Sequence, residues 1–562
     1  MSSPAHPGCW HAVVAFLTAA GADTVFGLPA DDLTLLAALR DGDPAGRSPR
    51  MVLCRDQRNA AFMATGYAIQ SGRPGVCVVG KGPASTNVLT GVLEAARSAA
   101  PLLVLAAGTA VERRGSAAFQ ELEQLPLMAP LVKWAHRVDH PDRVRPALDR
   151  AWAVAVGGVP GPVYLELPDQ LTNTPIPAGR LPRITVESTA SYRPPANSDA
   201  LAALRGSRRP VLLAGGGSRH RNAEGILELL AERLGAAMFS TASGRGTLDE
   251  ANSRFLGLSG LYLPAAAAPL WEQADLVVAL GSRLEETATF GWSSPRVVQV
   301  NLAPEEFSAE FDGPRVLADA GQAAAAWCAA LADHVPDAGW QRRLAETRTA
   351  IDAAAKEVLA GTSAIAHLLA TMDGLLPPDR IVVQENGLQD MWSYVFPHLP
   401  CRAPAGSVVP SEQTSLGFGV AAAAGVALAA PRRQVVAFVG DGAFTLAGAD
   451  LETLASEHIG VLYVVLCNGG YGWLQSQLDQ RGLAGDRFVF ADGGLPLLRP
   501  SGPRVSHAVL ERPEQAEEAL RRALEACAEG RPAVLFVPVD LADAPPGLSD
   551  VDGDFPGSGH GA

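Results

Sequence analysis

The sequence predicts an α/β protein that consists of three doubly wound domains, each built on a parallel sheet. Short apolar runs typical of buried parallel strands recur along the whole chain, for example at 75–79, 210–214 and 435–439. Segments with helical apolar spacing, such as 451–455, lie between these runs. With 562 residues the chain is too long for one hydrophobic core, so several domains are expected.

The expected strands fall into three stretches of the chain, which define the predicted domains. The first domain spans 1–187, the second 199–338 and the third 362–543, and a Gly/Pro-rich tail at 544–562 is expected to be flexible. A Pro/Ser-rich linker separates the first two domains, and a helical connector near 341–359 precedes the third. Further strands are expected at 24–27, 102–106, 162–167, 274–280 and 461–466.

The composition excludes several classes of partner. Charged residues make up 19% of the chain and the net charge is −14, which argues against binding to nucleic acid or to an anionic membrane surface. The seven cysteines are scattered without zinc-site spacing, and several lie in apolar runs, so buried thiols are expected. No basic leader with an apolar core and no membrane-spanning stretch is present in the sequence. These features predict a cytoplasmic protein.

The segment 434–470 carries the strongest functional signal. A strand pattern runs into Gly440-Asp441-Gly442-Ala443, and the next strand pattern is followed by Asn468-Gly469-Gly470. The carboxyl ends of parallel strands line the ligand crevice of such sheets, so Asp441 and Asn468 are expected to face it. A carboxylate oxygen, an amide oxygen and the Gly470 carbonyl suit Mg²⁺ that carries phosphates. A structural turn in some other α/β protein is the alternative, because a lone Gly-Asp-Gly is common.

This combination of strand, Gly-Asp-Gly, helix, strand and Asn-Gly-Gly resembles the diphosphate-binding motif of thiamin-diphosphate enzymes. The chain resembles the acetohydroxyacid synthase and pyruvate decarboxylase superfamily over nearly its whole length. The resemblance implies pyrimidine-binding, central and diphosphate-binding domains, in that order. The segments most similar to acetolactate synthases are GKGPASTN at 80–87, AAFQE at 117–121, VKWA at 132–135 and LGFG at 416–419, whereas FGLPAD at 26–31 is similar to pyruvate decarboxylases.

In these relatives the cofactor lies between the N-terminal domain of one subunit and the C-terminal domain of another, which implies a homodimer or homotetramer. The resemblance implies that Asp441, Asn468 and the Gly470 carbonyl hold Mg²⁺ against the diphosphate. Leu416 matches the residue that supports the bent cofactor, with core packing as the alternative, and the Thr414 carbonyl matches the acceptor for the 4′-amine. The other expected cofactor-binding residues are Gly440, Gly442 and Ala443, and Gly387, Leu388 and Gln389 at the start of the third domain's first helix.

One position departs from the family pattern. Gln57 stands in the 55–67 segment where relatives carry the glutamate that hydrogen-bonds N1′ of the pyrimidine and moves a proton. A glutamine amide donates a hydrogen bond but transfers no proton at neutral pH, which costs about 10²–10⁴ in rate. Three hypotheses stay open: catalysis with modified activation, a proton relay through Asp31, Asp56 or water, and a cofactor-binding protein without catalysis. We favour an active but slow enzyme, because the rest of the site matches the family.

Three further residues are candidates for the substrate side of the site. Lys81 replaces a small residue of relatives and is either a cation for a substrate carboxylate or an ion-paired surface lysine. Asp31 is either an acid or base near the leaving group or the cap of the next helix. Gln120 matches a polar residue of the acceptor pocket in acetolactate synthases.

The resemblance implies a thiamin-diphosphate- and Mg²⁺-dependent carboligase of acetolactate-synthase type that acts on pyruvate or a related 2-oxo acid. Gln477 stands where housekeeping acetohydroxyacid synthases carry a specificity tryptophan, so a secondary pathway is favoured. The alternatives are a 2-oxo acid decarboxylase and a catalytically silent cofactor-binding homologue. Arg283 fits a position that meets FAD in some relatives, but others keep the fold without FAD, which leaves FAD unassigned.

Overall fold

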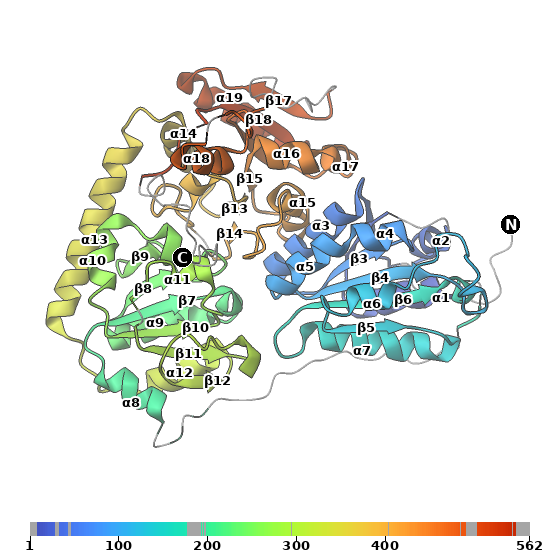
Figure 1. The fold of residues 1–562 in the computed structure, drawn as a ribbon, viewed down its shortest axis with the longest axis horizontal. Helices are drawn as coiled ribbons and strands as arrows, with labels where there is room; N and C mark the ends of the chain where they lie inside the picture. Colours follow the sequence, from blue (N-terminus) through green and yellow to red (C-terminus); the bar gives the residue numbers. More distant parts are fainter. Residues whose placement is uncertain are drawn as a thin grey trace. The chain divides into compact units, whose positions relative to one another are not determined.

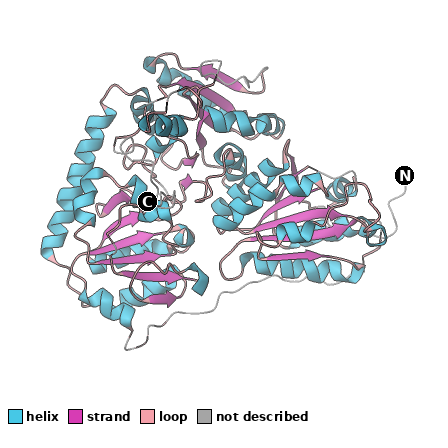
Figure 2. Ribbon diagram, in the orientation of Figure 1, coloured by secondary structure: helices cyan, strands magenta, loops and turns pink. Residues whose placement is uncertain are grey.

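The computed structural model contains three parallel sheets of six strands, with helices on the faces of each sheet (Figures 1 and 2). It describes residues 8–28, 33–42, 47–172, 174–176, 193, 195, 198–293, 295–402, 404–483, 485–490, 503–541 and 543–546. The predicted fold class is therefore confirmed. Each sheet lies within one of the three predicted domain ranges, whose exact boundaries stay predictions.

The first sheet has the strand order β2-β1-β3-β4-β6-β5. Its strands are β1 (Thr24–Gly27), β2 (Arg50–Leu53), β3 (Gly75–Val79), β4 (Leu102–Gly108), β5 (Trp134–Arg137) and β6 (Pro162–Pro168). The central strands β3, β4 and β6 are buried along their whole length, which explains their mainly apolar sequence. The associated helices are α1 (Cys9–Ala19), α2 (Thr34–Asp41), α3 (Gln57–Ser71), α4 (Pro83–Asn87), α5 (Leu89–Arg97), α6 (Gln124–Met128) and α7 (Val144–Val156).

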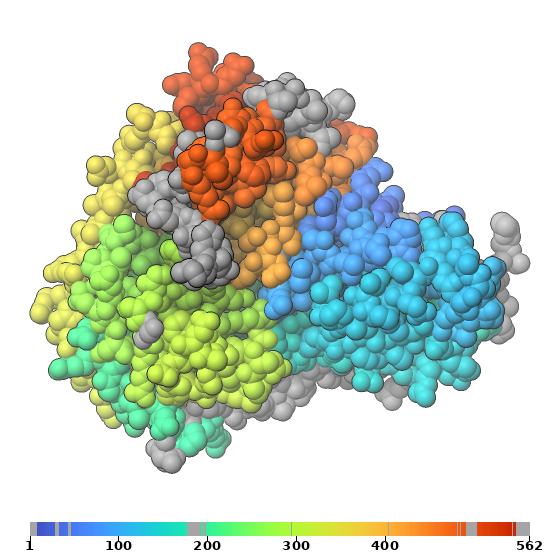
Figure 3. Space-filling model, viewed as in Figure 1, coloured from blue at the N-terminus to red at the C-terminus, as the bar shows by residue number. Residues whose placement is uncertain are grey.

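The second sheet has the order β12-β11-β10-β7-β8-β9 and again only parallel neighbours. Its strands are β7 (Pro210–Ala214), β8 (Ala237–Ser240), β9 (Phe255–Leu258), β10 (Leu276–Leu280), β11 (Val297–Asn301) and β12 (Arg315–Leu317). Its helices are α8 (Asp199–Gly206), α9 (Ile226–Leu234), α10 (Ala268–Trp271), α11 (Glu286–Thr289) and α12 (Ala320–Ala330). The predicted connector forms α13 (Ala338–Leu359), the long yellow helix in Figure 1, and yellow atoms line the edge of the green second domain in Figure 3.

The third sheet has the order β14-β13-β15-β16-β18-β17. Its strands are β13 (Ile381–Gln384), β14 (Ser407–Val408), β15 (Val435–Gly440), β16 (Val461–Cys467), β17 (Ser506–Val509) and β18 (Ala533–Pro538). Its helices are α14 (Ala364–Leu375), α15 (Phe418–Ala429), α16 (Asp441–Ala447), α17 (Leu451–Ser456), α18 (Gly472–Gln480) and α19 (Ala516–Ala528). All seven cysteines of the chain are buried thiols, as expected.

The chain divides into two compact units that cut across the three sheets. Unit 1 comprises 1–188, 413–432 and 447–459, and unit 2 comprises 189–412, 433–446 and 460–562. Helices α15 and α17 of the third domain therefore pack with the first sheet in unit 1. Of the helices that the structure describes, no single one is long and apolar enough to cross a membrane, although the bent pair α13 and α14 meets the criterion by length and composition.

Glycine makes the main helix contact of unit 1 very close. A Cβ atom at Gly66 of α3 would lie 2.5 Å from the carbonyl oxygen of Ala422 in α15. A Cβ atom at Gly425 of α15 would lie 1.8 Å from the carbonyl oxygen of Met63 in α3. Met63 precedes Gly66 along α3, whereas Gly425, which faces Met63, follows Ala422, which faces Gly66. The two helices therefore run antiparallel. Only glycine at both positions allows the backbones to approach this far.

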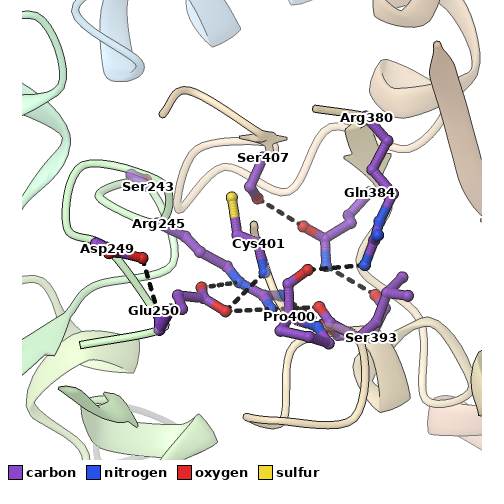
Figure 4. Close-up of polar contacts among 12 residues, drawn as sticks. Ser243, Arg245, Asp249, Glu250, Arg380, Gln384, Ser393, Pro400, Cys401 and Ser407 are labelled. Carbon is purple, nitrogen blue, oxygen red and sulfur yellow. Dashed lines mark hydrogen bonds and ion pairs between the residues drawn. The ribbon is translucent and has the colours of Figure 1, made fainter. Parts of the chain in front are cut away.

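A buried ion pair joins two segments of unit 2 (Figure 4). Arg245 Nε donates to Glu250 Oε1 at 2.8 Å, and the same guanidinium donates to the carbonyl oxygens of Ser393 and Leu399. Glu250 Oε2 also accepts from the backbone N–H of Cys401 at 2.7 Å. Each charge has both an opposite charge and backbone partners, which is the condition for burying an ion pair.

Candidate active site

Asp441 occupies the predicted place at the end of β15, where it is also the first residue of α16. Its side chain is only 3% exposed, and Oδ2 accepts a hydrogen bond of 2.8 Å from the backbone N–H of Gly469. That contact joins the end of β15 to the turn after the neighbouring strand β16. Burial raises the pKa of Asp441 to about 6, so the carboxylate is costly to keep charged without a cation.

Asn468 lies on the same turn and contacts a second predicted residue. Asn468 Oδ1 accepts from the backbone N–H of Gly470 at 3.0 Å, and its Nδ2 donates to Gln389 Oε1 at 2.6 Å. Gln389 in turn donates through Nε2 to the carbonyl oxygen of Leu541 at 2.7 Å. A Cβ atom at Gly472 would lie 2.9 Å from Gln389 Oε1, so α18 begins close beside this pair. The structure thus brings Asp441, Asn468 and Gln389 to one turn.

The location predicted for 387–389 was wrong in one respect. Helix α14 precedes β13, so these residues are not at the start of the domain's first helix. They form the turn between β13 and a short 3₁₀ helix at Asp390–Ser393. The reason is that this connection has one irregular turn instead of an α-helix, which periodicity does not reveal. Leu388 is buried, and its side chain contributes packing, not polarity.

Asp390 is a residue of this site that the sequence analysis missed. It is 3% exposed, and its Oδ1 is buried without a hydrogen-bond partner. Burial and the nearby charge of Asp441 raise the pKa of Asp390 to about 8, although the backbone N–H groups of Gly387 and Gly440 oppose this rise. The carboxyl group therefore ties the 387–389 turn to the end of β15. A lone acidic residue between Gln389 and the apolar Met391 was the available sequence signal.

The oxygen donors of this turn fit a hard cation. Within the described ranges no group of three or more His, Cys, Asp and Glu side chains is arranged to hold a metal. Asp441 and Asn468 instead offer one carboxylate and one amide oxygen, and both reach backbone groups of the 469–470 turn. Mg²⁺ is commonly bound by one or two protein oxygens together with water and phosphate oxygens. The donor set fits that mode, and the orphaned Asp390 oxygen marks the site as polar and buried.

Gln57 lies in unit 1 as the first residue of α3, whose N-cap is Asp56. Asp56 Oδ1 accepts from the backbone N–H groups of Arg58 and Asn59 at 2.8 and 3.3 Å, which explains why the helix begins here. The side chain of Gln57 is half-buried and accepts a hydrogen bond of 2.7 Å at Oε1 from Nδ2 of Asn87. Asn87 ends the GKGPASTN segment and was not among the predicted site residues.

A second missed residue holds the start of α3. Asp450 is 2% exposed and accepts from the backbone N–H of Arg55 at 2.8 Å, from Asn59 Nδ2 at 2.7 Å and from Thr453 Oγ1 at 2.9 Å. All these residues belong to unit 1. Burial raises the pKa of Asp450, and the three hydrogen bonds oppose this rise. The carboxylate therefore fixes the residues on both sides of Gln57.

Leu416 and Thr414 precede α15 in the same unit. Leu416 is 38% exposed, which argues against the core-packing alternative within one chain. Thr414 has a φ of +43°, a strained backbone conformation for a β-branched residue. The backbone N–H of the next residue, Ser415, donates to Glu94 Oε2 at 3.4 Å. Because α3 and α15 are antiparallel, Gln57 and Leu416 lie at opposite ends of the helix pair, roughly 20 Å apart at 1.5 Å per residue.

The predicted substrate residues are only partly brought together. Lys81 forms an ion pair with Asp169, so the ion-paired alternative describes it in this structure. Gln120 has a φ of +56°, and its carbonyl oxygen would lie 2.6 Å from a Cβ atom at Gly82, so the two loops touch. The neighbouring Phe119 is 70% exposed. Asp31 lies outside the described residues.

Arg283 of the second domain is engaged by acidic side chains. It forms ion pairs with Glu306 and, at 3.6 Å, with Glu285. Burial and the charge of Glu412 raise the pKa of Glu285 to about 7. These contacts are intramolecular, and FAD remains unassigned.

Three family models match the chain in the order of its sheets. They are the N-terminal binding domain of thiamine pyrophosphate enzymes at residues 9–127, the central domain at 198–327 and the C-terminal binding domain at 386–537. The chain is similar to a probable 2-ketoarginine decarboxylase of Pseudomonas aeruginosa, with 32% identity over 81% of each protein. It is 28% identical to an acetolactate synthase large subunit of Parasynechococcus marenigrum, over 83% of this chain and 78% of that protein.

An isozyme 1 large subunit of acetolactate synthase from Escherichia coli is 25% identical, over 83% of this chain and 82% of that protein. These similarities extend over all three sheets, and the described geometry places the Gly-Asp-Gly and Asn-Gly-Gly segments at adjacent strand ends. The chain belongs to the thiamine pyrophosphate (thiamin diphosphate) enzymes and is an enzyme of the acetolactate synthase type.

Proposed function

We propose that the protein is a Mg²⁺-dependent carboligase that uses thiamin diphosphate to join pyruvate or a related 2-oxo acid to a carbonyl acceptor. The observation that carries this proposal is the meeting of Asp441, Asn468 and Gln389 at one turn of a family-matched domain. When bound, the cofactor supplies a carbon nucleophile that attacks the 2-oxo group. The protein supplies binding, orientation and proton control around it.

On this proposal Asp441, Asn468 and the Gly470 carbonyl hold Mg²⁺ against the diphosphate. Gln389 accepts the 2.6 Å hydrogen bond from Asn468 Nδ2 and so orients the amide, which keeps Asn468 Oδ1 directed at the 469–470 turn. The other residues proposed to line the cofactor are Gly387, Leu388, Gly440, Gly442, Ala443, Thr414 and Leu416. Gln57 would donate a hydrogen bond to the pyrimidine, while Gln120, Lys81 and Asp31 stay proposed substrate-side residues.

The geometry of unit 1 supports a homodimer or homotetramer. Gln57 and Leu416 should contact the same cofactor, whose rings are only a few ångströms across. Within one unit they lie at opposite ends of the α3–α15 pair. One chain therefore cannot apply both residues to one cofactor, whereas two copies can exchange them. We propose that each site takes Gln57 and Leu416 from different copies.

A simple 2-oxo acid decarboxylase is the second candidate. It is favoured by the 32% identity to the probable 2-ketoarginine decarboxylase. The two functions differ only in whether the carbon left after loss of CO₂ is protonated or joined to an acceptor. A silent cofactor-binding homologue would bind thiamin diphosphate without turnover.

Product analysis tests the proposal. Purified protein is incubated with thiamin diphosphate, Mg²⁺ and pyruvate, quenched in acid, and analysed by NMR for products and cofactor adducts, with Gln57→Glu in parallel. Acetolactate or another acyloin is the expected product. Aldehyde without acyloin would favour the decarboxylase, and a panel of longer 2-oxo acids extends the test. Bound cofactor with neither product nor adduct from any donor would overturn the enzymatic proposal.

A further inference from the structure

The amide side chains of Gln57 and Asn87 meet in unit 1, among the residues proposed to bind the pyrimidine of the cofactor. Asn87 is the last residue of the short helix α4, and Gln57 is the first residue of α3. Asn87 Nδ2 donates to Gln57 Oε1 at 2.7 Å. Both residues belong to unit 1, and Asn87 is exposed while Gln57 is half-buried. Gln57 is not needed to cap α3, because Asp56 already caps that helix.

An amide has one oxygen, which accepts, and one NH₂ group, which donates. When Asn87 occupies Gln57 Oε1, the Gln57 NH₂ group remains to bond elsewhere. If the Gln57 amide were turned round, Oε1 would face a bound ligand and would offer it an acceptor instead of a donor. The two orientations differ by a half-turn of the amide and have nearly the same shape, so a neighbouring donor can decide between them.

The ring nitrogen N1′ of an aminopyrimidine is an acceptor, so it requires a donor from the protein. We propose that Asn87 is a positioning residue that fixes the Gln57 amide with its NH₂ group toward N1′ of the bound cofactor. This inference rests on the proposed binding of thiamin diphosphate. It also explains why the pair matters for this chain: a carboxylate at position 57 presents oxygen in either orientation, whereas an amide must be oriented.

Asn87→Asp tests the orientation directly. The new carboxylate accepts from the Gln57 NH₂ group and so takes the donor away from the pyrimidine. We expect Asn87→Asp to weaken thiamin diphosphate binding about tenfold and Asn87→Ala to weaken it about threefold, as for one misdirected and one lost hydrogen bond. Binding is measured in the presence of Mg²⁺ by titration calorimetry. The exchange rate of the cofactor C2 proton, followed by NMR without substrate, should fall in the same order.

Thr86→Asp is the matched control, because it places the same charge one residue earlier on α4. Thermal unfolding of each variant checks that the fold is kept. A double-mutant cycle then separates orientation from general structure: Asn87→Ala should cost clearly less in a Gln57→Glu background, where no amide needs orienting. Equal effects of Asn87→Asp and Thr86→Asp would overturn the inference, as would equal costs of Asn87→Ala in both backgrounds.

The outcomes for the two proposals are distinguishable. Tight cofactor binding with the predicted order of variants, but no product from any 2-oxo acid, would keep the role of Asn87 and reject the carboligase. Acyloin formation with no difference among the position-87 variants would do the reverse. Wild-type protein that does not bind thiamin diphosphate would overturn both.

Discussion

The proposed cofactor-binding residues of unit 2, the diphosphate half, and those of unit 1, the pyrimidine half, are held in different ways. In the diphosphate half, Asp441 is buried and linked to the backbone of the next strand's turn, and Asn468 is linked to both that turn and Gln389. In the pyrimidine half, the half-buried Gln57 accepts one side-chain hydrogen bond, from the exposed Asn87. The diphosphate half is thus a buried hydrogen-bonded network, whereas the pyrimidine half presents a half-buried amide at the start of a helix.

This difference indicates where the fold tolerates substitutions. Removing a residue from a buried hydrogen-bonded network leaves its partners unpaired, which costs about 1–3 kcal/mol for each group. An amide at the first residue of a helix has few partners to lose. An exchange between glutamine and glutamate at position 57 should therefore cost the fold little, so we expect its effect on the chemistry of the proposed site.

The largest effect is expected for Asp441→Ala, which removes the only proposed charged ligand of Mg²⁺. We expect the affinity for thiamin diphosphate with Mg²⁺ to fall more than about 100-fold, above the 10–100-fold typical for loss of an outer partner of a metal site. Calorimetry measures the affinity, and the exposed Asp486→Ala serves as the control in the same unit. Unchanged binding by Asp441→Ala would show that this turn is not the diphosphate site.

Gln57→Glu should act on rate, not affinity, which sharpens the contrast between the halves. A side chain that can carry a proton should raise the C2 exchange rate about 10–100-fold, at or below the low end of general acid–base effects, because the proposed amide donor to N1′ is already in place. Cofactor affinity should change less than about threefold. Gln57→Asn, a shorter amide without a titrating group, is the control. A rate that does not rise would favour a relay that bypasses position 57.

Asp450→Asn tests how much the buried hydrogen bonds of Asp450 stabilise the start of α3 in the pyrimidine half. The substitution turns one acceptor oxygen into a donor that faces Arg55 N–H, Asn59 or Thr453. We expect the free energy of unfolding to fall by about 1–2 kcal/mol, measured as a lower urea midpoint. The exposed Glu112→Gln, also in unit 1, should leave the midpoint unchanged. An unchanged midpoint for Asp450→Asn would mean that α3 is held by packing alone.

The halves also differ in how far the sequence could predict them. Asp441 and Asn468 follow apolar strand patterns, and parallel strands of adjacent position bring their ends to one edge, so their proximity was predictable. The Gln57–Asn87 bond joins two helices through side-chain rotamers, and no periodicity encodes it. The same holds for Lys81 and Asp169, which lie 88 positions apart. The buried Asp390 was overlooked because burial in an irregular turn has no repeating pattern.

The smallest expected effect is a pH dependence confined to the diphosphate half. Asp441 has a pKa raised to about 6 by burial, so below that pH it is neutral and a proton competes with the cation. The affinity for thiamin diphosphate with Mg²⁺ should therefore fall by about tenfold for each pH unit below pH 6. Gln57 does not titrate, so the C2 exchange rate at saturating cofactor should show no step in this range from position 57. Calorimetry at several pH values and NMR exchange on the loaded protein measure the two quantities separately. An affinity that stays flat down to pH 5 would mean that the buried carboxylate does not bind the cation, whereas a step in exchange at saturation would reveal another titrating group in the pyrimidine half.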